Sequence, residues 1–125
     1  MPTVFVIVYR MEDFKHLTDL IEQFRNDRDW KKFHTPKDVA MDIVIEAGEV
    51  LEHFQWKSDR EITEYVKKHK EEIGDELSDV LHGVLLMALE LDIDLVDAFE
   101  KKMKKNEQKY PVKKVKGRNV KYTAL

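Results

Sequence analysis

The sequence predicts an all-α fold, a four-helix bundle formed by one domain spanning residues 1–125. Three observations predict it. The chain is 42% hydrophobic yet contains only four Gly and three Pro, which are too few breakers for the many turns of an all-β fold. Its apolar residues recur at three- and four-residue steps, the period of one-sided helices. Its 125 residues fit one domain and are too few for two of full size.

The first predicted helix covers residues 12–27. Its apolar face consists of Phe14, Leu17, Leu20, Ile21 and Phe24. Residues 1–10 are also apolar, but they lack the basic start and the small-residue cleavage site of a signal peptide. They are expected to form either a short strand or an N-terminal extension of a domain that begins near residue 11.

Cap signals divide the rest of the chain. Thr35 followed by Pro36 predicts a helix start, and the helix is expected to reach about residue 56. Ser58 offers the next cap, before a helix over residues 60–90 in one or two pieces, with Gly74 inside it. Asp94 is expected to cap a fourth helix over residues 95–108, and residues 109–125 form a basic tail.

Residues 80–91 are apolar on most sides of the third helix. A bundle this small cannot bury such a helix on all sides by itself. The pattern therefore favours burial against another copy, and the expected assembly is a dimer or a dimer of dimers.

Composition limits the classes of site. The absence of Cys excludes disulfides, thiolate metal sites and a cysteine nucleophile, and it fits a reducing, cytoplasmic location. No run of 18 apolar residues occurs, so no membrane span is expected. The net charge is −3, yet residues 101–125 contain ten Lys and Arg and a single acid. This asymmetry indicates either solvated helix faces with a basic tail, or acids that hold a cation beside lysines that hold an anion.

Two pairs of acids suggest the second interpretation. Glu46 and Glu49 lie three residues apart on one predicted helix, and Glu76 and Asp79 repeat this spacing on the next. Residues three apart share a helix face, so each pair repels itself unless a cation or a proton intervenes. Ligands that are all oxygen favour Mg²⁺, with Mn²⁺ as a possible substitute.

Aromatic and basic residues could bind the rest of a phosphorylated ligand. Trp30, Phe33 and Trp56 lie near the ends of the second helix, where they either pack in the core or stack on a base. His34 either caps a helix or contacts a base edge or phosphate. Lys102 and Lys105 on the fourth helix, and Lys31 and Lys32 before the second, could meet phosphate oxygens or be simple surface charges.

In order along the chain, these residues resemble the MazG-like nucleoside triphosphate pyrophosphohydrolases, an all-α family. The acidic pattern reads Glu46-Ala-Gly-Glu49, 26 residues, then Glu76-Leu-Ser-Asp79. The resemblance is closest to the dCTP pyrophosphatase branch and covers roughly residues 14–125. The stretches of sequence that are specific to this branch are Arg28-Asp29-Trp30, Phe33-His34, Phe54-Gln55-Trp56-Lys57, Lys102 with Asn106, Lys109-Tyr110-Pro111 and Lys121-Tyr122-Thr123.

The resemblance implies a Mg²⁺-dependent enzyme that cleaves a nucleoside triphosphate between the α- and β-phosphates, with dCTP or a modified pyrimidine nucleotide as substrate and nucleotide pool sanitation as the role. It also implies a homodimer or homotetramer whose site is completed across subunits. Carried over residue by residue, it implies metal ligands Glu46, Glu49, Glu76 and Asp79; base and sugar contacts Trp30, Phe33, His34 and Trp56; and phosphate contacts Lys102 and Asn106. Glu49 is our choice for the residue that activates water.

One position departs from the pattern of the dCTP-selective members. They carry a tyrosine four residues after the last acid, where this chain has Gly83, preceded by His82. The missing tyrosine predicts a wider pocket and leaves the preferred base open.

Other interpretations compete with hydrolysis. A di-iron bundle needs two Glu-x-x-His motifs, and only Asp79-Val-Leu-His82 partly matches. The basic tail, with Tyr110 and Tyr122, could instead make the chain a nucleic-acid- or nucleotide-binding module without enzymatic activity. The acidic body would repel a polyanion, so nucleic acid is not the expected partner. A family member that binds nucleotides without turnover is the third alternative.

Overall fold

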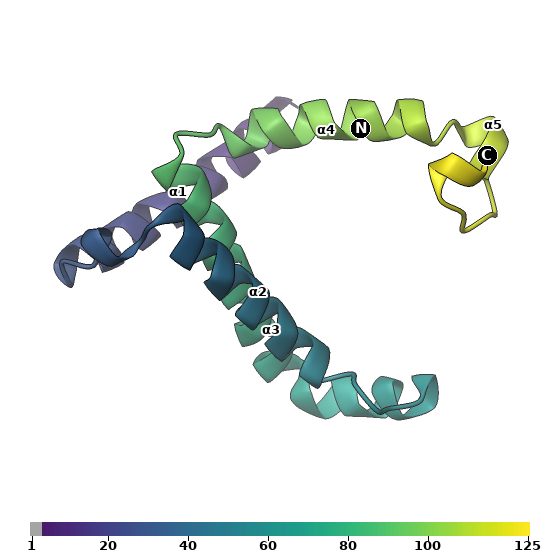
Figure 1. The fold of residues 1–125 in the computed structure, drawn as a ribbon, viewed down its shortest axis with the longest axis horizontal. Helices are drawn as coiled ribbons and strands as arrows, with labels where there is room; N and C mark the ends of the chain where they lie inside the picture. Colours follow the sequence, from purple (N-terminus) through teal and green to yellow (C-terminus); the bar gives the residue numbers. More distant parts are fainter. Residues whose placement is uncertain (1–3) are drawn as a thin grey trace. The chain divides into compact units, whose positions relative to one another are not determined.

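The computed structural model describes the backbone of residues 4–125 and the side chains from residue 12 onward. Within these residues the secondary structure is helical throughout, which confirms the all-α prediction (Figure 1). The elements are α1 (Val4–Asp27), the 3₁₀ turn η1 (Lys31–Phe33), α2 (Pro36–Glu52), α3 (Asp59–Glu90), α4 (Leu95–Lys109), the short α5 (Val112–Val115) and η2 (Tyr122–Ala124).

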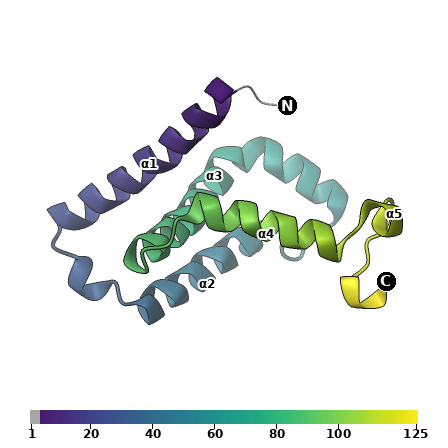
Figure 2. The same cartoon turned by 90° about the horizontal axis from the view of Figure 1, so that it is seen from above.

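The chain divides into two compact units, Met1–Asp92 and Ile93–Leu125. In the first unit α2 and α3 form an antiparallel hairpin, seen side by side in Figures 1 and 2, and α1 packs on α3. Its buried apolar side chains are Ile21, Val39, Ile73, Leu85, Leu86 and Ala88. Val39 is the most deeply buried of them, with 1% of its surface exposed.

The predicted helix starts are confirmed by their caps. The Thr35 hydroxyl accepts the backbone N–H of Asp38, and Pro36 occupies the first turn. Ser58 and Glu61 form a reciprocal capping box at the start of α3. Asp94 caps α4 by accepting the N–H of Asp97. Each cap satisfies amide groups that the helix itself leaves unpaired.

The helix boundaries differ from the sequence prediction in three places. α1 begins at Val4, so a strand is wrong for residues 4–10, while residues 1–3 lie outside the described part. α2 ends at Glu52 rather than near residue 56, and a tight turn follows. α3 consists of two pieces, one of the two expected alternatives, and they meet at His69, where φ is −120° and ψ is 19°, a position that the sequence prediction did not give.

Gly83 lies buried where α3 crosses α2. A Cβ atom at this position would lie 2.7 Å from Ile43 Cγ1, so the two helices approach too closely for a larger residue to fit without displacing Ile43. Ile43 fills the space on this side of Gly83. The wider pocket expected from the missing tyrosine stays a prediction. The contact also fixes the register of the hairpin, with Ile43 opposite Gly83.

A buried ion pair joins α1 to α3. Arg25 is 4% exposed, and its guanidinium donates to the carboxylate of Glu90, which lies 65 residues later. The carbonyl of Arg25 accepts the backbone N–H of Trp30, with N and O 3.1 Å apart. The pair thus fixes the chain segment that carries Trp30.

The second unit contains α4, α5 and η2. Tyr122 packs edge-on against Tyr110, and the Lys109 ammonium lies 4.9 Å from the centre of the Tyr122 ring. These contacts fold the basic C-terminal segment back toward the end of α4.

Candidate metal centre

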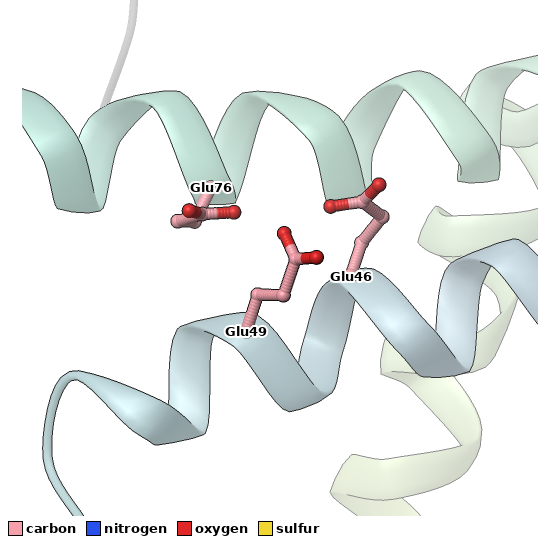
Figure 3. Close-up of side chains that lie close together, drawn as sticks. All are labelled: Glu46, Glu49 and Glu76. Atoms are coloured by element: carbon pink, nitrogen blue, oxygen red, sulfur yellow. The ribbon is translucent and has the colours of Figure 1, made fainter.

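Three of the four predicted acids meet between α2 and α3. Glu46 and Glu49 extend from α2 toward Glu76 on α3, as Figure 3 shows. One carboxylate oxygen from each lies within 4.8 Å of the others, which makes the three residues a candidate metal-binding group. Asp79, the fourth predicted ligand, is exposed one turn further along α3 and lines the adjoining cavity.

The cluster is half-buried and leaves polar atoms without a partner. Oε2 of Glu46 and Oε2 of Glu76 are both buried, and neither accepts a hydrogen bond from the described residues. Buried carboxylate oxygens are normally paired, because an unpaired one loses its hydration without compensation. The two oxygens therefore require a ligand that donates protons or positive charge.

The crowding of the carboxylates changes the pKa of Glu46 and of Glu76. A hydrogen bond with Glu49, followed by burial and by repulsion from Glu49, raises the pKa of Glu46. The same three causes, in the same order, raise the pKa of Glu76 to about 7. Figure 3 shows the carboxyl group of Glu49 between those of Glu46 and Glu76, which agrees with its effect on both pKa values.

These residues fit a hard divalent cation. The donors are all carboxylate oxygens, which Mg²⁺ and Mn²⁺ prefer over nitrogen or sulfur. A cation would satisfy the two buried oxygens and would replace the protons that the raised pKa values hold in its absence.

The stability of the metal-free protein is expected to depend on pH. The pKa of Glu76 is about 7 in the folded chain, above the value of about 4.3 in an unfolded one. The folded state therefore binds more protons between these values, and the free energy of unfolding should fall as pH rises from about 4.5 through 7. Thermal melts in EDTA would measure this fall. Glu76→Gln should reduce this dependence of stability on pH. An equal dependence in the variant would contradict the raised pKa of Glu76 as its cause.

A cavity of about 330 Å³ opens beside the cluster. Its lining includes the acids Glu46 and Asp79 and the buried apolar residues Val39 and Leu86. The other lining residues are Trp30, His34, Asp42, His82 and Gly83. Polar and apolar side chains share this lining about equally. Convergent polar groups beside apolar ones in a concave site can orient a small ligand.

The structure places the other predicted binding residues differently. Trp30 and His34 line the cavity, whereas Phe33 is exposed outside it. Trp56 is 92% exposed and has a φ of 67°, a left-handed conformation that is rare for an aromatic residue. Lys102 and Asn106 belong to α4, in the second unit.

Two residues of the cavity were not singled out as site residues from the sequence. Asp42 precedes Glu46 by one turn of α2, and His82 follows Asp79 by three residues on α3. The helical spacing from the predicted acids could have identified both, since positions three or four apart share a face.

Comparison with known proteins places the chain in a family. A match to the MazG-like family covers residues 41–125, and mouse dCTP pyrophosphatase 1 is 38% identical over 117 residues. That alignment spans 92% of this chain and 67% of the mouse protein. The chain belongs to the MazG-like family. The resemblance inferred from the sequence is thereby confirmed.

Other relatives agree with this membership. Human dCTP pyrophosphatase 1 is 34% identical over the same length, spanning 92% of this chain and 67% of the human protein. The crystal structure of a pyrophosphatase from Archaeoglobus fulgidus superposes with a TM-score of 0.74 at 42% identity. The superposed part covers 78% of this MazG-like chain and 91% of the Archaeoglobus fulgidus chain.

In the part of the chain that the structure describes, none of the helices is both long enough and apolar enough to cross a bilayer.

Proposed function

We propose that the protein hydrolyses a nucleoside triphosphate between its α- and β-phosphates, releasing a nucleoside monophosphate and pyrophosphate. The predicted enzyme class, a nucleotide pyrophosphohydrolase, is confirmed by membership of the MazG-like family and by relatives named as pyrophosphatases. The observation that carries the proposal for this chain is the carboxylate cluster of Glu46, Glu49 and Glu76, placed beside a cavity of ligand size.

Glu46, Glu49, Glu76 and Asp79 would hold Mg²⁺, or Mn²⁺ in its place. A triphosphate brings several negative charges, which four carboxylates alone would repel. The bound cation supplies the opposite charge, so that phosphate oxygens can approach, and it polarises the bond to be cleaved. The buried, unpaired oxygens of Glu46 and Glu76 support this ligand set.

Glu49 would orient or deprotonate the attacking water. Its carboxyl group lies between those of Glu46 and Glu76 and interacts with both (Figure 3). Water is the expected nucleophile because the chain has no Cys.

The cavity would hold the nucleoside. Trp30 and His34 form its wall, and an aromatic face contributes about 1–3 kcal/mol of stacking to a base. Phe33 follows Trp30 in the 3₁₀ turn and is exposed outside the cavity, where it would contact a bound nucleoside from its open side. The names of the relatives favour dCTP as substrate. A modified pyrimidine nucleotide as substrate, and pool sanitation in the cytoplasm as the role, belong to the same proposal.

A homodimer or homotetramer would complete the site. On α2 and α3 several large apolar side chains are more than half exposed in the single copy: Met41, Val44, Ile45, Leu51 and Leu77. Such exposure is typical of an interface. Trp56, Lys102 and Asn106 would contact the base and the phosphates in the assembled protein. The strained, exposed backbone of Trp56 supports a role for it in binding.

A product assay tests the proposed function. The protein is incubated with Mg²⁺ and a panel of normal and modified deoxynucleoside triphosphates, and pyrophosphate and orthophosphate are measured separately. We expect pyrophosphate and a monophosphate in equal amounts, and no turnover in EDTA. Orthophosphate as the sole inorganic product would exclude cleavage between the α- and β-phosphates.

The alternative, a binding module that uses the basic tail, has less support from the structure. Tyr122, one of the two tail aromatics, is already engaged by Tyr110 and Lys109. Salt-dependent binding of an oligonucleotide, without any nucleotide hydrolysis, would favour this alternative.

A further inference from the structure

The cavity contains two polar residues that the proposed chemistry does not use, Asp42 and His82. Neither forms a hydrogen bond or an ion pair with the side chains that the structure describes. His82 contacts Phe24 edge-on, with ring centres 6.1 Å apart, which leaves its nitrogens available.

The register of the helices places both residues on the same side of the acids. Asp42 lies one turn before Glu46 on α2, and His82 lies three residues after Asp79 on the antiparallel α3. The contact between Ile43 and Gly83 sets these positions opposite each other. Asp42 and His82 therefore form the next layer of the hairpin, on the side away from Glu49 and Glu76.

This layer faces the part of a nucleotide that is not phosphate. The phosphates would be held at the carboxylate cluster. The cavity shares Glu46 with this cluster and is also lined by Asp42, one turn back along α2, and by His34 and Trp30, which precede α2. Val39 and Leu86, the buried apolar residues of the lining, suit a planar base. Nδ1 of His34 is buried and has no hydrogen-bond partner among the described residues, which is a second sign that this end of the cavity receives a polar ligand.

We propose that Asp42 selects the base: its carboxylate accepts a hydrogen bond from an exocyclic amino group, and it disfavours bases with a carbonyl at that position. The inference rests on the proposed function and specifies the substrate of the same site. An ionised carboxylate can only accept hydrogen bonds, so it pairs with the amino group of cytosine or adenine. A carbonyl oxygen in the same place would face the carboxylate without a proton between them. His82 can donate a ring N–H to an acceptor on the same base edge.

Two isosteric substrate pairs test this inference. dCTP and dUTP have the same size but differ at the exocyclic amino or carbonyl group and at the adjoining ring nitrogen, which accepts in cytosine and donates an N–H in uracil. dATP and dITP differ in the same two places. The wild-type protein should have the higher kcat/KM for the amino member, by about 10- to 100-fold, in whichever pair the cavity accepts. Asp42→Ala should remove this preference by lowering kcat/KM for the amino member only. Asp42→Asn should also lower the ratio toward one, because an amide can donate to a carbonyl.

Glu52→Gln is the matched control. Glu52 is an exposed acid on the same helix, outside the cavity, so the ratio should remain at the wild-type value. Pyrophosphate release from none of the substrates would overturn the proposed function itself. An active wild-type protein with equal rates within each pair would overturn only the inference. A loss in Asp42→Ala that is equal for both members, together with a higher Mg²⁺ requirement, would make Asp42 a metal ligand and would also overturn it.

Discussion

Glu49→Gln should lower the rate of triphosphate hydrolysis by about 10²- to 10⁴-fold, the range expected when a general base is removed. The glutamine has the same size, but it can neither take a proton from water nor add negative charge to the metal site. Steady-state pyrophosphate release at saturating Mg²⁺ would measure the loss, and circular dichroism would check that the helices persist. Glu52→Gln, outside the cluster, should retain wild-type activity. Full activity in Glu49→Gln would refute the role of this residue.

The same substitution should leave the metal-free protein at least as stable as wild type. Glu49 is the main cause of the raised pKa values of Glu46 and Glu76, so its carboxyl group is the centre of the repulsion between the two helices. Neutralising it relieves that repulsion. A stable but inactive variant therefore separates a catalytic role from a structural one.

Glu90→Ala should destabilise the fold by about 3–5 kcal/mol, the usual cost of leaving one partner of a buried ion pair unpaired. Arg25 is 4% exposed, and its Nε already lacks a hydrogen-bond partner among the described residues. Removing the carboxylate would leave the buried guanidinium charge without its counter-ion. This loss is large beside a total stability of about 5–15 kcal/mol for a typical domain.

Chemical denaturation at neutral pH would measure this change, and the double variant Arg25→Leu with Glu90→Leu provides the control. Removing both charges should cost much less, because no charge is left buried and unpaired. Glu90→Ala should also raise KM, since the Arg25 carbonyl accepts the N–H of Trp30 at the cavity wall. A change below about 1 kcal/mol would mean that the pair contributes no more than a surface salt bridge.

Local signals allowed much of the fold to be predicted. Thr35, Ser58 and Asp94 each mark a helix start because their side chains accept an amide proton that the first turn leaves free. The three-residue spacing of Glu46 and Glu49 placed both on one helix face, and the structure directs them toward Glu76.

Contacts between distant residues could not be predicted in this way. The pairing of Arg25 with Glu90 depends on how α1 crosses α3, and no pattern near either residue encodes it. The interruption of α3 at His69 could not be predicted from the neighbouring sequence either. His69 stacks on Tyr65, and its Nδ1 contacts Glu72, but both contacts exist only once the helix has formed.

The aromatic residues show the same limit. Trp30 and Trp56 have similar positions relative to the second helix in the sequence, yet Trp30 lines the cavity and Trp56 is exposed. The difference arises from the backbone. The Arg25 carbonyl holds Trp30, whereas the turn after α2 forces Trp56 into the left-handed region.

Calorimetric titration of the metal-free protein with Mn²⁺ or Mg²⁺ near pH 7.5, without nucleotide, tests the central claim most directly. We expect saturable binding to the wild-type protein, proton release that reflects the raised pKa of Glu76, and severely weakened binding in Glu49→Gln and Glu76→Gln. The absence of saturable binding to the wild type, or equal binding by both variants, would contradict a metal centre between α2 and α3.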